Sequence, residues 1–128
     1  MTMKPIKTLM IAPGELPSVK ELLPTIEAFI QAISVGVQEL GKIKKKKIDK
    51  DVYIIYNATA PLSLDGNRKI GKEIICGTFY VIAMNKDIPR SLTDKEIETY
   101  TERFHEIEMF DDWDVICQYV DSLYLSRK

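Results

Sequence analysis

The stretch DGNRKIGKEIICGTFYVIAM, residues 65–84, predicts a turn that leads into a buried strand. Its first part carries glycine and asparagine, which tolerate the backbone conformations of tight turns. Its second part, Glu73–Met84, is an almost unbroken apolar run of the kind found in strands that are covered on both faces. Gly77 interrupts this run and indicates a β-bulge or the close approach of another backbone segment.

The N-terminal half of the chain adds further predicted strands. The segment VYIIYN, residues 52–57, is β-branched and aromatic on both faces, which is typical of a strand at the centre of a sheet. Residues 6–12 and 16–22 flank the turn signal Pro13–Gly14 and predict a hairpin. We expect its second strand at a sheet edge, because Pro17 cannot donate a hydrogen bond to a neighbouring strand.

One amphipathic helix is predicted between the hairpin and the central strand. Pro24 suits its first turn, where the missing N–H costs nothing. Its apolar stripe, at helical spacing, consists of Ile26, Phe29, Ile30 and Ile33. The following VGVQEL, residues 35–40, is a further candidate strand, and the six lysines of residues 42–50 predict an exposed loop.

Two helices are predicted after the buried strand. In SLTDKEIETYTERF, residues 91–104, Thr93 can cap a helix, Glu96 can reach back to that cap, and Leu92 can pack beside it. The buried stripe of this helix would consist of Ile97, Tyr100, Phe104 and Ile107. A last stripe runs through Trp113, Ile116, Cys117, Val120 and Leu123. The expected fold is therefore α+β: a single domain over residues 1–128, with a small, mostly antiparallel sheet, one early helix and two C-terminal helices.

The composition is that of a soluble globular protein. The chain has 128 residues, 45% of them apolar and 29% charged, and no apolar run reaches the roughly 20 residues of a membrane span. Pro13 cuts the first apolar run short, which argues against an export signal. Cys76 and Cys117 both lie in apolar patterns, so we expect buried thiols in the cytoplasm rather than a disulfide. The net charge of −1 argues against general nucleic-acid affinity.

Asn67 and Arg68 form the first candidate binding site. A turn over residues 65–67 would hold Arg68 on a defined side, where its planar fork of donors could bind a carboxylate or phosphate of a ligand or partner. The alternative is structural: Arg68 pairs with an acidic residue of the same domain or caps the end of a helix. The structural alternative is the favoured interpretation.

The other candidate binding residues are Lys44, Lys45, Lys46, Lys47 and Trp113. The lysines could contact nucleic-acid phosphates, but no aromatic residues interleave with them to stack bases, so a solvated segment is the simpler interpretation. Trp113 is either part of the core or an exposed anchor at an interface. The acidic residues of positions 108–114 lack the spacing of a calcium loop, and charge at a helix N-terminus explains them better.

No catalytic constellation is evident in the sequence. His105 is the sole histidine, and both cysteines lie on apolar stripes, so a pair of nucleophile and base is not expected. One histidine and two scattered cysteines do not make a standard zinc site, and GNRKIG lacks the spacing of a phosphate-binding loop. We therefore expect a protein that is not an enzyme and that holds no cofactor or metal.

Several segments together resemble a family of small bacterial proteins known as a domain of unknown function. The resemblance covers Ile6 to Phe104 and rests on IAPGELPSVKEL, VYIIYN, NRKIG, IICGTFYVI and SLTDKEIETYTERF in this order. It implies an accessory protein of a phage, plasmid or conjugative element of Gram-positive bacteria, of a kind that in some cases lies beside antirestriction genes. Gly66 departs from the family, which often has a proline nearby, and the lysine segment and the Trp113 helix look like individual additions.

The resemblance and the missing catalytic groups lead to one preferred function and two alternatives. The preferred hypothesis is a non-enzymatic protein that binds and blocks a host defence system: a CRISPR effector, which would make it an anti-CRISPR inhibitor, or a restriction enzyme. The first alternative is a small-molecule binder that holds a nucleotide or signalling ligand against Asn67 and Arg68. The second is an RNA-binding protein that uses the lysine segment, including contact with a guide RNA. A monomer and a homodimer are both compatible with the sequence.

Overall fold

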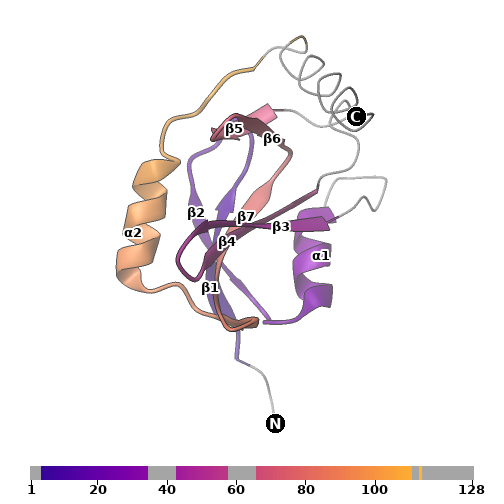
Figure 1. Cartoon of the computed structure of the whole chain (residues 1–128), viewed down its shortest axis with the longest axis vertical. Coiled ribbons are helices and arrows are strands. Elements are labelled where there is room, and N and C mark those ends of the chain that lie inside the picture. Colours follow the sequence, from indigo (N-terminus) through magenta and orange to yellow (C-terminus); the bar gives the residue numbers. More distant parts are fainter. Residues whose placement is uncertain (1–3, 35–42, 58–65, 111–112, 114–128) are drawn as a thin grey trace, which may run out of the picture.

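The computed structural model of the chain describes residues 4–34, 43–57, 66–110 and 113. Strands and helices follow one another along these residues as Figure 1 shows. In chain order they are β1 (Ile6–Ile11), β2 (Ser18–Leu22), α1 (Ile26–Ser34), β3 (Ile43–Asp49), β4 (Val52–Asn57), β5 (Gly66–Ile70), β6 (Glu73–Cys76), β7 (Phe79–Asn85), β8 (Ile88–Arg90) and α2 (Asp94–Arg103).

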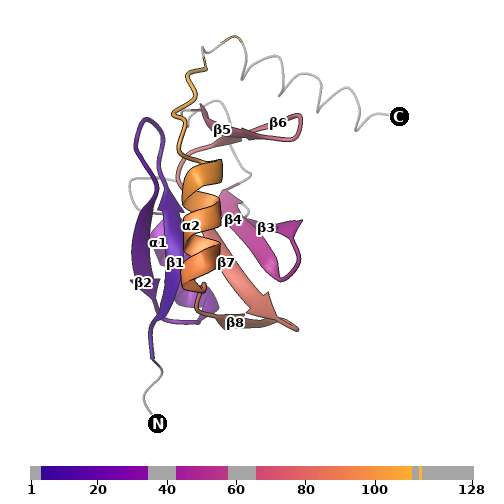
Figure 2. The ribbon, with the colours of Figure 1, turned by 90° about the vertical axis from the view of Figure 1, so that its left-hand side faces the viewer.

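An antiparallel sheet forms the centre of the molecule. Its strand order is β2-β1-β7-β4-β3, so that β7 lies in the middle and β2 and β3 lie at the two edges. β8 pairs with the last residues of β7 and continues the line of β1. β5 and β6 form a separate hairpin near one end of the sheet (Figure 2). The predicted hairpin of β1 and β2 and the edge position of β2 are confirmed.

The sheet carries one helix on each face (Figures 1 and 2). On one face, α2 and the β5–β6 hairpin pack over a buried cluster that includes Leu9, Ile11, Val52, Ile54, Tyr56, Ile70, Ile75, Phe79, Val81, Leu92, Tyr100 and Phe104. On the other face, α1 packs over a second cluster that consists of Ile6, Phe29, Ile33, Ile55, Tyr80, Ile82 and Met84. Alternate residues of β7 enter the two clusters, which explains why its sequence is apolar throughout.

The start of α2 follows directly from its sequence. Thr93 is the N-cap: its hydroxyl accepts a hydrogen bond from the Glu96 amide, and the Glu96 carboxylate accepts one from the Thr93 amide. Leu92 is buried beside this cap, and Tyr100 and Phe104 form the buried side of the helix. The predicted capping box is therefore confirmed.

Residues 65–84 contain more elements than predicted. Gly77, with a φ of +75°, separates β6 in the hairpin from β7 in the main sheet, so the prediction of one continuous strand was wrong. The turn also lies elsewhere. Asn67 and Arg68 belong to β5, and the chain reverses after it at Gly71, whose φ is +62°.

Three other predictions differ from the structure. Lys44–Lys47 form part of β3 rather than a loop, because pairing with β4 outweighs the low strand propensity of lysine. Ile26 is 73% exposed and does not join the buried stripe of α1. The buried stripe of α2 stops at Phe104, and Ile107 is exposed, because the helix ends at Arg103.

The mostly antiparallel sheet, the early helix and the first of the two C-terminal helices are confirmed, so the fold is α+β. The predicted strand at residues 35–40 lies outside the described residues, as does the last helix apart from Trp113. In the part of the chain that the structure describes, no helix has both the length and the apolar character needed to cross a membrane.

Candidate functional site

Asn67 and Arg68 lie at a point of β5 where its pairing with β6 shifts register. Such a bulge sets two residues of one strand against one residue of its partner and so redirects a side chain. Both side chains are buried, with exposed fractions of 0% and 1%. Asn67 Nδ2 donates hydrogen bonds to the carbonyl oxygens of Ile11 at 2.8 Å and Gly77 at 2.9 Å. Asn67 therefore ties the end of β1 and the turn after β6 to β5.

Arg68 donates hydrogen bonds to acceptors of its own chain. Its Nε binds the Phe104 carbonyl at 3.1 Å, Nη1 binds Asn67 Oδ1 at 2.8 Å, and Nη2 binds the Glu15 carbonyl at 2.8 Å. Phe104 is the C-cap of α2, so the cation lies at the negative end of the helix. Burial lowers the pKa of Arg68 below its usual value, and the charge of Glu108 opposes this shift. The arrangement matches the structural interpretation, in which Arg68 caps a helix.

The lysines of residues 44–47 lie on an edge strand. Successive side chains of a strand point to opposite faces of its sheet. The cross-strand neighbours on β4 place Lys45 and Lys47 on the face that α1 covers, and Lys44 and Lys46 on the α2 face. Lys46 Nζ lies 3.2 Å from Glu73 Oε2. Within the described residues, Lys44 and Lys47 have no ion-pair partner.

Lys45 is directed toward the turn between β7 and β8. Its Nζ lies 3.8 Å from Asp87 Oδ1 and 4.9 Å from the centre of the Tyr53 ring. Lys86 and Asp87 form this two-residue turn, and their φ angles of 50° and 68° are those that a type I′ hairpin turn requires. The Asp87 side chain is 92% exposed, so water screens the ion pair and the pair is weak.

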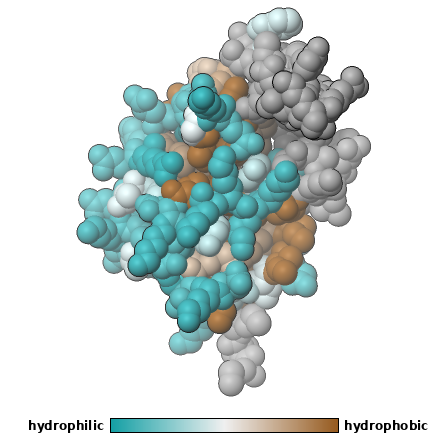
Figure 3. Space-filling model, in the orientation of Figure 1, coloured by the Kyte–Doolittle hydropathy of each residue, from teal (hydrophilic) through white to brown (hydrophobic). Residues whose placement is uncertain are grey.

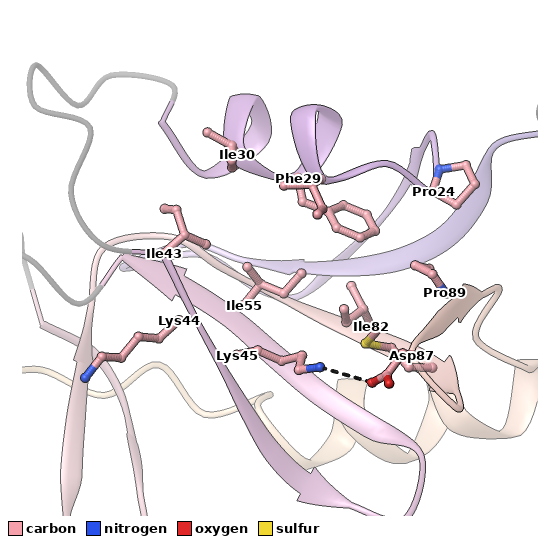
Figure 4. A pocket seen from close by; sticks show the side chains of 12 residues that line it. Pro24, Phe29, Ile30, Ile43, Lys44, Lys45, Ile55, Ile82, Asp87 and Pro89 are labelled. Carbon is pink, nitrogen blue, oxygen red and sulfur yellow. Dashed lines mark ion pairs between the residues drawn. The ribbon is translucent and has the colours of Figure 1, made fainter.

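A groove of about 660 Å³ opens between α1 and the sheet beside these charges. Figure 4 shows Phe29 and Ile30 on α1 facing Ile43 and Ile55 across it, with Lys45 and Asp87 at its rim. Among the described residues, the lining consists of Pro24, Ile26, Phe29, Ile30, Ile43, Lys44, Lys45, Ile55, Ile82, Met84, Asp87 and Pro89. The groove is therefore an apolar channel with charged groups along one side, and it is the candidate functional site.

Among the described residues, only the short helix α1 covers this face of the sheet, and the groove lies beside it. α1 has nine residues, whereas the sheet beneath it is five strands wide. The floor residues Ile55 and Ile82 belong to the buried cluster on this face, and Ile43 packs against that cluster from the edge. In Figure 3, hydrophobic residues gather over α1, while hydrophilic residues cover the neighbouring surface over β3. From the sequence, Ile55 and Ile82 were predicted only as parts of buried strands, and Ile43 as part of an exposed loop.

Trp113 is exposed, with 69% of its surface accessible. Trp113 is therefore not part of the core, and its role as an anchor at an interface stays a prediction. His105 is exposed and Cys76 is buried. Among the described residues, no three histidine, cysteine, aspartate or glutamate side chains come together in a group that could hold a metal ion.

Comparison with known protein families identifies the family of the chain. Residues 6–105 match the DUF3846 family, a domain of unknown function. The chain belongs to the DUF3846 family. The match agrees with the predicted resemblance over Ile6 to Phe104 and includes both Asn67–Arg68 and the groove of this DUF3846 domain. No curated protein and no solved structure matches the chain. The predicted origin in a mobile genetic element stays a prediction.

Proposed function

We propose that this DUF3846 protein is a non-enzymatic binding protein of a mobile genetic element that attaches to a host defence protein in the cytoplasm and blocks it. A CRISPR effector is the first candidate target, and a restriction enzyme is the second. The observation that supports the proposal is the apolar groove beside the lysine-bearing edge strand β3. Protein interfaces combine an apolar centre with a polar rim in this way.

The charge of this surface indicates the kind of target surface that it fits. Lys45 and Lys47 lie on the groove side of β3, and both are exposed. A basic rim is complementary to an acidic surface. It does not imitate the phosphates of nucleic acid. We therefore expect the protein to act at an acidic surface of the defence protein rather than inside its nucleic-acid channel.

The test is a defence assay in a Gram-positive host that carries active CRISPR and restriction systems. We expect the tagged protein to raise plasmid or phage survival and to co-purify with one defence protein. The double variant Lys45→Glu and Lys47→Glu should lose both effects. The matched control, Lys20→Glu and Lys72→Glu, reverses two exposed lysines elsewhere and should keep both. Unchanged survival with the wild-type protein, in hosts shown to express it, would remove the proposal.

Binding of a small molecule is the second candidate function, with the groove rather than Asn67 and Arg68 as the binding site. Ligand pockets typically have volumes of about 300 to 1,000 Å³ and mostly apolar walls, and the groove agrees with both. Arg68 is directed to acceptors of its own chain, so the ligand would occupy the groove instead. Native mass spectrometry of the purified protein tests this: a bound compound that Ile26→Glu releases supports it, and bare protein counts against it.

RNA binding gains no comparable support. The four lysines of residues 44–47 divide between two faces of the sheet, so they do not form one basic patch. Lys45 and Lys46 also lie beside carboxylates of the chain itself. An RNA mobility shift at low ionic strength that salt abolishes would restore this alternative.

A further inference from the structure

We infer that the groove receives an amphipathic helix of the partner protein, which lies beside α1 on the same face of the sheet and directs acidic side chains toward Lys45 and Lys47. The inference rests on the proposed function in one respect: it takes the molecule that occupies the groove to be a protein. It adds the shape and the chemistry of the segment that is recognised. Helix-in-groove docking is a common mode of peptide recognition.

The dimensions of the sheet leave room for one more helix. Strands lie about 4.8 Å apart, so the outer strands of a five-stranded sheet are about 19 Å apart. A helix with its side chains is about 10 to 12 Å wide, and the nine residues of α1 extend about 13 Å. Within the part of the chain that the structure describes, α1 therefore covers about half the width of this face. The groove occupies part of the other half, and a parallel or antiparallel segment of two to three turns fits alongside α1.

The lining suits the apolar stripe of a helix. Ile55 and Ile82 form the floor, Phe29 forms one wall, and Ile43 forms the other (Figure 4). Each of these residues belongs to, or packs against, the buried cluster on this face. Apolar side chains from an occupant would thus extend an existing core. A helix presents such side chains on one side, at spacings of three and four residues.

The exposed lysines of β3 indicate which polar side chains the occupant carries beside its apolar stripe. Lys47 is exposed and has no ion-pair partner within the described residues. Lys45 has only the weak contact with Asp87, whose side chain is 92% exposed. A carboxylate on the occupant can bind Lys47 and can replace Asp87 at Lys45. Acidic residues beside the apolar stripe are therefore the expected signature.

An extended strand added to the outer edge of β3 is the competing geometry. It would use the backbone of β3 and would leave the floor of the groove empty. Lysines along an edge strand are also a common device against strand addition. The two geometries differ in the sequence period of the bound segment, which is 3.6 residues for a helix and two for a strand.

The test is selection of peptides on the full-length protein from a random display library. We expect the enriched peptides to carry apolar residues at helical spacing with flanking Asp or Glu, and to gain helical circular dichroism on binding. Methyl resonances of Ile43, Ile55 and Ile82 should shift in the titration. Peptides with alternating apolar residues, or no specific peptides, would overturn the inference.

One substitution probes the groove with little effect on the fold. Ile26 lines the groove, is 73% exposed and is the first residue of α1, where a carboxylate is favourable. Ile26→Glu should weaken the selected peptides at least about tenfold, because it places an anion against an acidic apolar segment. The control is Leu16→Glu, which also replaces an exposed apolar residue with glutamate. Leu16 is 56% exposed and lies near the turn end of the β1–β2 hairpin, whereas Ile26 follows its open end. Leu16→Glu should leave the affinity unchanged. Equal affinity of the wild type and Ile26→Glu would overturn the inference.

The inference and the proposed function can fail separately. If selected helical peptides bind in the groove but no host defence is blocked, the proposed target is wrong and the inference stands. If defence is blocked and Ile26→Glu blocks it equally well, the proposed function stands and the groove is not the site. A small amphiphile that fills the groove and cannot be displaced by any selected peptide would overturn the inference in favour of the small-molecule candidate.

Discussion

Arg68 connects three segments that are distant in the sequence. Its guanidinium reaches the carbonyl of Glu15 in the β1–β2 turn, the Asn67 side chain in β5 and the Phe104 carbonyl at the end of α2. A buried cation is costly unless its donors are satisfied, and here each of its nitrogen atoms has an acceptor. The same bonds give the Phe104 and Glu15 carbonyls a donor. Arg68 thus holds the hairpin, β5 and α2 in one arrangement.

Arg68→Ala should therefore lower the free energy of unfolding by about 3 kcal/mol, because it leaves the buried Phe104 carbonyl and the buried Asn67 Oδ1 without this donor. Arg68→Lys should recover only part of this loss, since an ammonium group cannot reach all the acceptors at once. Urea unfolding monitored by circular dichroism measures both. Lys69→Ala, at the exposed neighbouring side chain, is the control and should change stability by less than about 0.5 kcal/mol. A loss of similar size in Arg68→Ala and Lys69→Ala would show that the network contributes little.

At the scale of the elements, α2 is the helix whose position is best explained. Glu96 serves both its start and its attachment to the sheet, because its carboxylate binds the Thr93 amide and both terminal nitrogens of Arg90 at 2.8 and 3.0 Å. Arg90 is the last residue of β8. At the other end, Tyr100 donates a hydrogen bond to Asp49 of β3 at 2.9 Å. The helix is therefore held against strands at two places.

Removal of the N-cap hydroxyl should weaken α2. Thr93→Ala leaves the Glu96 amide without its acceptor and should cost about 1 kcal/mol of stability. Thr93→Ser keeps the hydroxyl and should cost no more than a few tenths of a kcal/mol. Urea midpoints of the three proteins provide the measurement. If Thr93→Ser lost as much stability as Thr93→Ala, packing of the threonine methyl group, and not the cap, would be the cause.

The pair of Arg90 and Glu96 should make stability depend on pH. The hydrogen bonds from Arg90 lower the pKa of Glu96 from 4.5 to about 2, although burial opposes the shift. Because the pKa is lower in the folded state, this stabilisation is complete above about pH 4.5 and is lost as the pH falls toward 2. With allowance for the partial exposure of the pair, we expect about 2 kcal/mol.

Glu96→Gln tests this pH dependence. The variant should be less stable than the wild type by about 2 kcal/mol near neutral pH, and the difference should close as the pH falls to about 2. Chemical denaturation at a series of pH values measures it, with Glu98→Gln, an exposed residue of the same helix, as the control. A difference that stayed constant over the whole range would mean that the carboxylate charge is not responsible.

At the scale of the whole molecule, the two faces of the sheet are covered unequally. Within the described residues, α2 and the β5–β6 hairpin cover one face, whereas only α1 covers the other. The groove lies on the α1 face, with Lys45 in its lining and Lys47 on the same side of β3. The surface at the groove is thus apolar, with exposed lysines beside it.

Binding at this surface should depend on salt. Dissolved salt screens exposed charges. The rate at which the protein associates with its captured partner should therefore fall as the NaCl concentration rises from about 0.05 to about 0.5 M. The double variant Lys45→Glu and Lys47→Glu should bind more slowly at low salt and should lose most of this dependence. Surface plasmon resonance with the captured partner gives both rates. A salt dependence equal to that of the wild type would place the charged contact elsewhere on the molecule.

Local sequence patterns were sufficient to predict a structural feature where one short segment contains all the groups that interact. The capping box needs only Thr93 and Glu96, three residues apart, and the β1–β2 hairpin needs only its turn signal. Patterns failed where a partner far along the chain decides the outcome. Lysine has a low strand propensity, so the lysine segment alone does not indicate a strand. Its pairing with β4 in the folded chain makes it the strand β3. The candidate groove could not be predicted, because its lining comes from α1 and four strands whose order was unknown.

The sequence by itself determined the fold class, the main strands, the N-cap of α2 and membership of the DUF3846 family, because periodicity, turn residues and capping act over a few neighbouring positions. Only the tertiary structure decided where the side chains of Arg68 and the lysines lie. The direction of a long side chain depends on which acceptors the folded chain brings within reach, such as the Glu15 and Phe104 carbonyls around Arg68. Which apolar residues stay open to a partner depends on how much of a sheet its helices cover, and that follows from strand order rather than from any single segment.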